Sequence, residues 1–185
     1  MLVPHIMSGQ TVGVLGLGRS GMAAAASLDA AGATIFAHDD NKPDTRLTNG
    51  TVMAWQDWPW QDLNALVISP GIPHLHPTPH PAAAHAAAKN IEIISEVEIA
   101  LRAAPRARIV VITGTNGKST TTALVGHCLQ QAGKAAAVGG NIGQAACSLE
   151  DPGPDGVIVL ELSSYQLETT PALSPTIAVV LNITP

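Results

Sequence analysis

The segment VVITGTNGKST, residues 110–120, combines residue types that bind phosphate. An apolar run ends at Gly114, and a helix-like stretch begins after the second glycine. A strand that turns into a helix in this way leaves backbone N–H groups unpaired at the positive end of the helix. Lys118 adds a full positive charge, and the hydroxyl of Ser119 or Thr120 is suited to ligate Mg²⁺. The segment therefore predicts a site for ATP and Mg²⁺, formed by Gly114, Thr115, Asn116, Gly117, Lys118, Ser119 and Thr120.

This loop is shorter than the common G-x-x-x-x-G-K-[ST] pattern. Ile112 stands where the first glycine of that pattern would be, so the loop reads G-x-x-G-K-S from Gly114. A plain glycine-containing helix start, without a ligand, is the alternative interpretation.

A second glycine motif, GLGRSG, spans residues 16–21 and directly follows another apolar run. Its first two glycines permit a turn that presents N–H groups to a pyrophosphate, and its third allows close packing of the next helix. Asp39 follows about twenty residues later at the end of the next apolar run, where a carboxylate is placed to accept a hydrogen bond from a ribose hydroxyl. Taken alone, the motif fits NAD as well as another nucleotide diphosphate, and a purely structural role for the glycines is a third interpretation.

Apolar runs alternate with alanine-rich or helix-like segments along the whole chain, which predicts an α/β fold with mainly parallel sheets. The pattern forms two tandem units, residues 1–105 and 106–185, that join around residues 102–108. Ser95 with Glu98 predicts a capping box for the last helix of the first unit, and Pro105 its end. The expected strands are Thr11–Gly16, Ala33–Asp39, Asn64–Pro70 and Asn90–Ser95, then Arg108–Thr113, Lys134–Gly139, Gly156–Leu162 and Thr176–Ile183.

Composition limits the possible partners. The 185 residues are 46% hydrophobic, enough to fill a core, and only 12% charged with a net charge of −5. No basic field favours nucleic acid or an anionic membrane as partner. We expect Cys128 and Cys147 to be reduced thiols in or near the core. The N-terminus lacks the pattern of a secretory leader, and a cytoplasmic protein is the expectation.

The order of five motifs resembles the Mur ligase family: GLGRSG, then SPGI at residues 69–72, GTNGKST, GGNIG at 139–143 and LELSSYQLE at 160–168. The serine after Lys118 and the residues of the last motif favour the family member that adds D-glutamate to UDP-N-acetylmuramoyl-L-alanine. The resemblance implies a Rossmann-like, UDP-sugar-binding parallel sheet in residues 1–105. It implies the start of a P-loop ATPase-type α/β domain in residues 106–185.

The resemblance also implies roles for single residues. Lys118 and Glu161 would be catalytic, and Ser119 and Glu161 would hold Mg²⁺. The UDP-linked substrate would contact Gly18, Arg19, Ser20, Asp39, Asp40, Ser69, Gly71, Asn141, Ser163 and Gln166. Relatives often have threonine and arginine where this sequence has Asp40 and Asn41, so one cationic contact is expected to be absent.

Several of these residues also have plain structural interpretations. Glu161 would then end a strand in solvent, Asn141 would be a turn residue beside a glycine, and Ser163 and Ser164 would cap the next helix.

The implied reaction is amide ligation driven by ATP through an acyl phosphate. Family members continue past NITP at residues 182–185 into a histidine segment, a modified lysine that helps hold a second metal, and a domain that binds the incoming amino acid. We therefore expect an N-terminal portion that is inactive alone. An NAD-dependent oxidoreductase and a non-catalytic nucleotide-binding module remain the alternatives.

Overall fold

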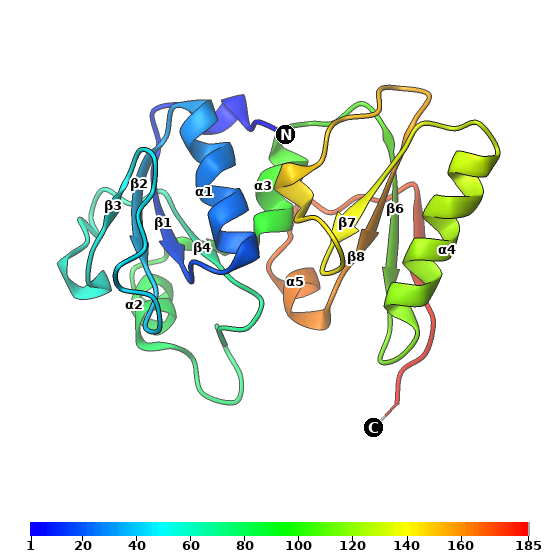
Figure 1. The fold of residues 1–185 in the computed structure, drawn as a ribbon. Coiled ribbons are helices and arrows are strands. Elements are labelled where there is room, and N and C mark those ends of the chain that lie inside the picture. The colour runs from blue at the N-terminus through cyan, green and yellow to red at the C-terminus, as the bar shows by residue number, and fades with distance from the viewer. Residues whose placement is uncertain (185) are drawn as a thin grey trace.

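The computed structural model describes residues 1–184 and contains two parallel β-sheets (Figure 1). The first sheet has the strand order β3-β2-β1-β4-β5, and every neighbouring pair is parallel. Its strands are β1 (Thr11–Leu15), β2 (Thr34–His38), β3 (Thr51–Val52), β4 (Ala65–Ile68) and β5 (Glu92–Ile94). Four of them lie within the runs that the sequence predicts, whereas the two-residue β3 is too short to leave a pattern.

The second sheet has the order β7-β8-β6-β9 and is also parallel throughout. Its strands are β6 (Arg108–Thr113), β7 (Ala136–Gly140), β8 (Val157–Glu161) and β9 (Ile177–Val180). Every residue of β8 is buried, whereas β9 lies at an edge and is mostly exposed. The wholly buried residues of β8 fit this central position, because the connecting segments of a parallel sheet cover both faces of its inner strands.

Residues 1–184 also contain five α-helices and three 3₁₀ turns, which precede or connect these strands. The helices are α1 (Arg19–Ala31), α2 (Pro81–Ala88), α3 (Glu96–Arg102), α4 (Lys118–Gln131) and α5 (Ser164–Glu168), and the turns are η1 (His5–Met7), η2 (Trp55–Asp57) and η3 (Ala146–Ser148). The α/β class with parallel sheets is therefore confirmed. Cys147 is buried as expected, but Cys128 is exposed, because only one side of α4 packs on the second sheet and Cys128 lies on the other.

Each sheet has a point where the strand order reverses. In the first sheet, the chain runs from β1 to β2 and β3 on one side, and then returns to β4 and β5 on the other side of β1. In the second sheet, α4 leads from β6 towards β7, while α5 leads from β8 to β9 on the other side. Ligands of open parallel sheets bind outside the carboxyl ends of strands at such points. The arrowheads of β1 and β6 point to the same side of the molecule, so both candidate sites open there (Figure 1).

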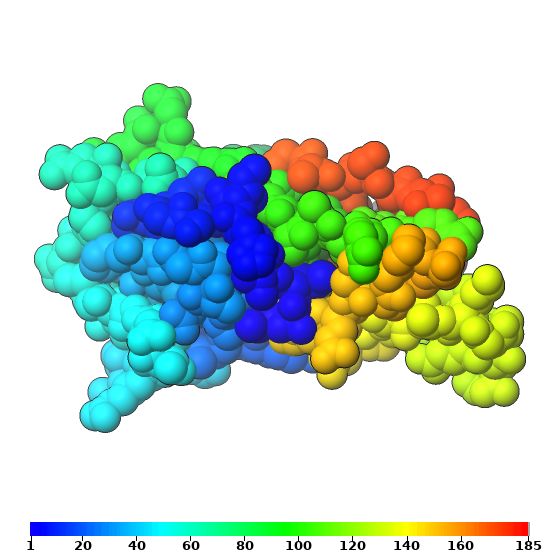
Figure 2. All heavy atoms as spheres, turned by 90° about the horizontal axis from the view of Figure 1, so that it is seen from above, coloured from blue at the N-terminus to red at the C-terminus, as the bar shows by residue number. Residues whose placement is uncertain are grey.

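The two sheets share one buried cluster. It contains residues of the first sheet such as Val14, residues of the second such as Ile158, and Val97 of α3 and Cys147 of η3 between them. The N-terminal segment also takes part, since the Leu2 N–H donates to the Cys147 carbonyl at 3.0 Å. Figure 2 shows this dark blue segment at the middle of the molecule, beside green and yellow-orange segments. The sheets therefore do not pack as independent bodies.

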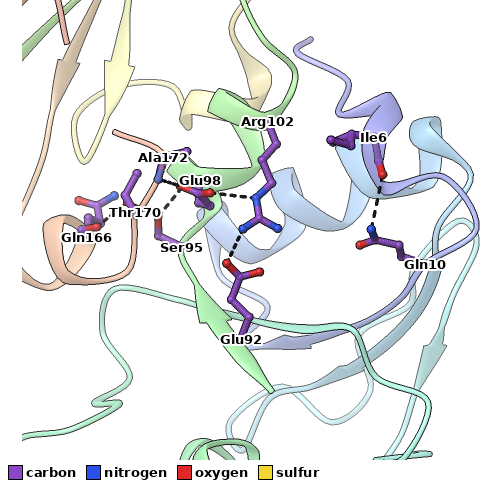
Figure 3. Close-up of polar contacts among 9 residues, drawn as sticks. All are labelled: Ile6, Gln10, Glu92, Ser95, Glu98, Arg102, Gln166, Thr170 and Ala172. Carbon is purple, nitrogen blue, oxygen red and sulfur yellow. Dashed lines mark hydrogen bonds and ion pairs between the residues drawn. The ribbon is translucent and has the colours of Figure 1, made fainter. Parts of the chain in front are cut away.

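Polar contacts of α3 reinforce this junction (Figure 3). The Ser95 hydroxyl accepts the Glu98 N–H at 3.1 Å, so the predicted N-cap is confirmed. The second half of the capping box is wrong, because the Glu98 carboxylate accepts from Arg102 at 2.9 Å and from the Ala172 N–H at 2.9 Å. Those two donors, one of them in the segment before β9, hold the carboxylate away from the start of α3.

Candidate functional site

The corner between β6 and α4 has the features of an anion site. Gly117 precedes α4 in a left-handed conformation with φ 83°, and the Thr121 N–H is the donor that begins the helix, bonding the Gly117 carbonyl at 3.0 Å. The N–H groups of the first helical turn therefore have no partner within the helix. That turn contains no acidic residue, so nothing there repels an anion. The positive end of the helix dipole adds to this preference.

Lys118 lies folded over this loop. Its Nζ donates to the carbonyl oxygens of Gly114 at 2.6 Å and Thr115 at 3.1 Å. The ammonium group is therefore held at the loop where phosphate oxygens would bind, and a third hydrogen remains available to them. Ser119 and Thr120 follow on the first turn of α4 and are exposed.

Asn182 fixes the phosphate loop from the far end of the chain, and sequence reasoning did not find it. Its Oδ1 accepts the Asn116 N–H at 2.9 Å, its Nδ2 donates to the Asn116 carbonyl at 3.0 Å, and its backbone carbonyl accepts the Thr115 N–H at 3.0 Å. Gly114, at φ 141°, lets this segment approach, because a Cβ atom there would lie 3.1 Å from backbone atoms of Asn182. Two of the N–H groups expected to face phosphate are thus used to shape the loop.

Glu161 ends β8, the strand next to β6, and is buried with 2% of its surface exposed. Its Oε1 accepts the Asn141 side-chain N–H at 3.2 Å, and its Oε2 has no hydrogen-bond partner among the described residues. A buried carboxylate oxygen left unpaired is costly, and a cation satisfies it. The alternative of a strand end in solvent is therefore wrong.

The residues present fit Mg²⁺ better than a metal that needs several protein ligands. Among residues 1–184 there is no group of three or more His, Cys, Asp or Glu side chains able to hold a metal ion. Mg²⁺ is commonly held by one or two carboxylates, with waters and substrate phosphates completing its octahedron. Glu161 has the free carboxylate oxygen that such a site needs, and the Ser119 hydroxyl stays a predicted second ligand.

A pocket of about 530 Å³ lies between the phosphate loop and α5, with Lys118, Ser163 and Asn182 among its lining residues. The Ser163 and Gln166 side chains form a capping box at the start of α5, and Gln166 is 1% exposed. Ser163 therefore caps α5 in this structure, and its contact with substrate remains a prediction. Another pocket, about 590 Å³ beside β7 and η3, contains none of the expected site residues, so size alone does not locate the site.

The glycine motif after β1 lies beside the loop after β4. The Ser69 hydroxyl donates to the Gly16 carbonyl at 3.1 Å, which joins the two loops at the reversal point of the first sheet. Gly18 is the N-cap of α1, and a Cβ atom added there would meet no heavy atom within 4 Å. Ser20 lies in the first turn of α1, and Gly71 has no neighbour where a Cβ would stand. These residues leave room for a ligand at the start of α1.

Asp39 supports this loop from within. Its Oδ2 accepts the Leu17 N–H at 2.6 Å and its Oδ1 accepts the Asn41 N–H at 2.9 Å. The carboxylate expected to bind ribose thus already orders the glycine loop. Lys42, which sequence reasoning did not single out, reaches the Leu17 carbonyl at 3.4 Å and brings a positive charge to the same loop.

Asp40 lies between two histidines. Its Oδ1 is 3.0 Å from His38 Nε2, and its Oδ2 is 2.9 Å from His80 Nε2. Hydrogen bonds from His38, and then from His80, hold the pKa of Asp40 below its ordinary value. Arg19, expected at the diphosphate, instead donates to the carbonyls of Gly143 and Asn141 in the loop after β7.

The sequence of this chain is similar to known proteins of one family. Residues 112–185 match the Mur ligase middle domain. Two relatives, from Rhodopseudomonas palustris (strain HaA2) and Paramagnetospirillum magneticum, are each 45% identical to the chain, over 96% and 100% of its length. Both are named UDP-N-acetylmuramoylalanine–D-glutamate ligase. The chain belongs to the Mur ligase family. The resemblance carried by the five motifs is thereby confirmed.

The match to these Mur ligases covers only part of their length. The chain spans 40% and 41% of the length of these two relatives. Solved structures show the same fold at low identity. The UDP-N-acetylmuramate:L-alanyl-gamma-D-glutamyl-meso-diaminopimelate ligase from Neisseria meningitides has a TM-score of 0.54 and 16% identity, over 96% of this chain and 61% of its own. A murein peptide ligase from Psychrobacter arcticus has a TM-score of 0.52 and 16% identity, over 96% of this chain and 44% of its own.

In residues 1–184 of this Mur ligase chain, no helix combines the length and the apolar content needed to cross a membrane.

Proposed function

We propose that the chain supplies the nucleotide-binding part of an ATP-dependent ligase that joins D-glutamate to UDP-N-acetylmuramoyl-L-alanine, a step of peptidoglycan precursor synthesis in the cytoplasm. The names of the 45% identical relatives support the substrates. One observation of this chain carries the proposal. A phosphate loop with Lys118 and a buried carboxylate with a free oxygen, Glu161, end the adjacent strands β6 and β8.

Residues 106–185 would bind Mg²⁺-ATP. Gly114 to Thr120 would surround the phosphates, and the Lys118 ammonium group, which bonds two loop carbonyls, would donate its third hydrogen to a phosphate oxygen. Ser119 and Glu161 would hold Mg²⁺, which neutralises charge on the transferring phosphoryl group when it is bound. The free Oε2 of Glu161 supports this assignment.

Residues 1–105 would bind the UDP part of the muramoyl substrate at Gly18, Arg19, Ser20, Asp39, Asp40, Ser69 and Gly71. The strand-order reversal beside β1 and the open space at Gly18 support this location. Asn141, Ser163 and Gln166 would contact the muramoyl part. The Asn141 amide already reaches Glu161, so it lies where that substrate would meet the phosphate site.

In the proposed reaction, an oxygen of the substrate carboxylate attacks the γ-phosphorus of ATP, and ADP leaves with the bridging oxygen. The D-glutamate amine then attacks the acyl phosphate, loses a proton, and releases inorganic phosphate. The protein need supply little covalent chemistry for this. Lys118 would offset the repulsion between two anionic reactants, and the two glycine corners would hold them in line. Binding is proposed for the 185 residues, and turnover for a protein of the relatives' length.

The two-site assignment is tested by titrating the ¹⁵N-labelled chain separately with UDP and with ATP plus Mg²⁺ and following backbone amide signals. UDP should shift signals of residues 16–21 and 69–72, and Mg²⁺-ATP those of residues 114–120. Shifts by UDP confined to residues 114–120 would show that the assignment is wrong. NADH serves as a third titrant, and saturable shifts at residues 16–21 by NADH but not by UDP would favour an oxidoreductase.

A further inference from the structure

Arg19 occupies a place where its charge is unfavourable unless it has partners elsewhere. It is the first residue of α1, where the helix dipole is positive, and it directly follows Gly18. The side chain turns away from the glycine loop and crosses to the second sheet. Its Nη1 donates to the Gly143 carbonyl at 2.7 Å and its Nη2 to the Asn141 carbonyl at 3.2 Å, across more than 120 positions of sequence.

The loop that Arg19 holds is fastened to Glu161 on its other side. The Asn141 N–H donates to the Glu161 carbonyl at 2.9 Å, and the Asn141 side-chain N–H donates to Glu161 Oε1 at 3.2 Å. Gly140 allows this contact, because a Cβ atom there would lie 2.4 Å from the Glu161 carbonyl oxygen. Asn141 is therefore fixed between Arg19 and the carboxylate that has one oxygen free.

These contacts form a continuous path from one corner to the other. The path runs from Gly18 through Arg19 to the Asn141 backbone, and from the Asn141 amide to Glu161. Displacement of the loop would withdraw the amide that orients Oε1. A guanidinium has five N–H donors in a fixed plane, so it is able to hold two carbonyls and still present donors to an anion at the start of α1.

We propose that Arg19 is a positioning residue that couples the two sites, so that a diphosphate at the start of α1 strengthens Mg²⁺-nucleotide binding at Glu161. This coupling rests on the proposed function for its two ligands. A diphosphate bound beside Gly18 orders Arg19, and an ordered Arg19 fixes Asn141 and thereby the carboxylate. Coupling between two ligands is reciprocal, so Mg²⁺-ATP strengthens UDP binding by the same factor.

Calorimetry measures the coupling. The dissociation constant of ATP is determined in the presence of Mg²⁺, and its value without UDP is divided by its value at saturating UDP. The wild-type ratio should be about fivefold or more. Arg19→Met should bring the ratio near one, and Arg19→Lys should retain only part of it, because a single ammonium does not match two carbonyls as the planar fork does. Arg46→Met removes the same charge from an exposed residue of the 39–50 segment and should leave the ratio unchanged.

A ratio of one in the wild type, or an unchanged ratio in Arg19→Met, would overturn the coupling. A wild-type ratio below one would also overturn it, since Arg19 would then be drawn from the loop by the diphosphate. The ligand-free chain provides a separate test. Arg19→Met should shift the Asn141 side-chain amide and Gly143 backbone amide signals, and Arg46→Met should not. If Arg19→Met shifts these signals but the wild-type chain binds neither UDP nor ATP, the proposed function and the coupling are wrong and the contact between Arg19 and the loop stands. If Arg19→Met leaves these signals unshifted, the positioning role of Arg19 is wrong.

Discussion

Two alanine substitutions in the GLGRSG motif, residues 16–21, separate packing from ligand binding. At Gly21, a Cβ atom would lie 1.8 Å from the carbonyl oxygen of Gly16. That neighbour is backbone and has no rotamer by which to move away. Overpacking that side chains can relieve costs about 1–3 kcal/mol, so we expect Gly21→Ala to reach at least the upper end of that range. At roughly 2–4 °C per kcal/mol for a domain of this size, the melting temperature should fall by about 6–12 °C.

Gly18 presents the opposite case. A Cβ atom there meets no heavy atom within 4 Å, and its φ of −73° is ordinary for alanine. Loss of the preferred N-cap residue costs at most about 1 kcal/mol, so folding should be little changed. The added methyl group would instead occupy the space through which a diphosphate approaches the helix, and we expect UDP affinity to fall by about tenfold or more.

Differential scanning fluorimetry and calorimetry with UDP distinguish these effects. The expected pattern is a large loss of stability for Gly21→Ala and a loss of affinity at nearly native stability for Gly18→Ala. Native-like melting of Gly21→Ala would refute the packing argument. Unchanged UDP affinity in Gly18→Ala would refute the location of the ligand, and the motif would then have a structural role only.

Two other predictions concern a buried acid and the phosphate loop. Burial raises the pKa of Glu96, whose Oε2 has no partner among the described residues, so the free energy of unfolding should be highest below the ordinary glutamate pKa and decline as the pH rises through the raised value. Glu96→Gln should remove this decline in urea titrations from about pH 4 to about pH 8, and a slope as steep as that of the exposed control Glu150→Gln would contradict the burial argument. Asn182→Ala removes two side-chain hydrogen bonds to Asn116, each worth about 0.5–1.5 kcal/mol, so the Asn116 amide should exchange with solvent roughly 5- to 150-fold faster. Unaltered exchange there would show that the pairing does not order the loop.

Local sequence patterns predict the parts of this molecule that local physics determines. Apolar runs become parallel strands, and a strand followed by glycines and a helix becomes a sharp corner at the start of that helix. The family resemblance singled out Glu161 within the predicted strand Gly156–Leu162, and the structure ends β8 at this residue. Nothing local reveals that one of its oxygens is left unpaired, since that depends on the loops around it.

Contacts between distant segments are beyond such patterns. Asn182 pairs with Asn116 across 66 positions, and this follows only from the place of β9 beside β6. Arg19 follows a glycine motif and therefore suggests a phosphate ligand, yet the junction of the two sheets brings carbonyls within its reach. Glu98 has capping-box spacing but meets stronger partners in Arg102 and Ala172, whereas Ser163 and Gln166 have no such competitors and complete a capping box.

Calorimetric titration of ATP in the presence of Mg²⁺ into the 185-residue chain tests the central claim most directly. Lys118→Ala removes the ammonium at the phosphate loop, and Lys134→Ala removes the same charge beyond the opposite end of α4. Hydrogen bonds that involve a charge contribute about 1.5–3 kcal/mol, so Lys118→Ala should weaken ATP binding by roughly 10- to 150-fold while Lys134→Ala binds like the wild type. Equal ATP affinity in the wild type, Lys118→Ala and Lys134→Ala would contradict a phosphate site at this corner.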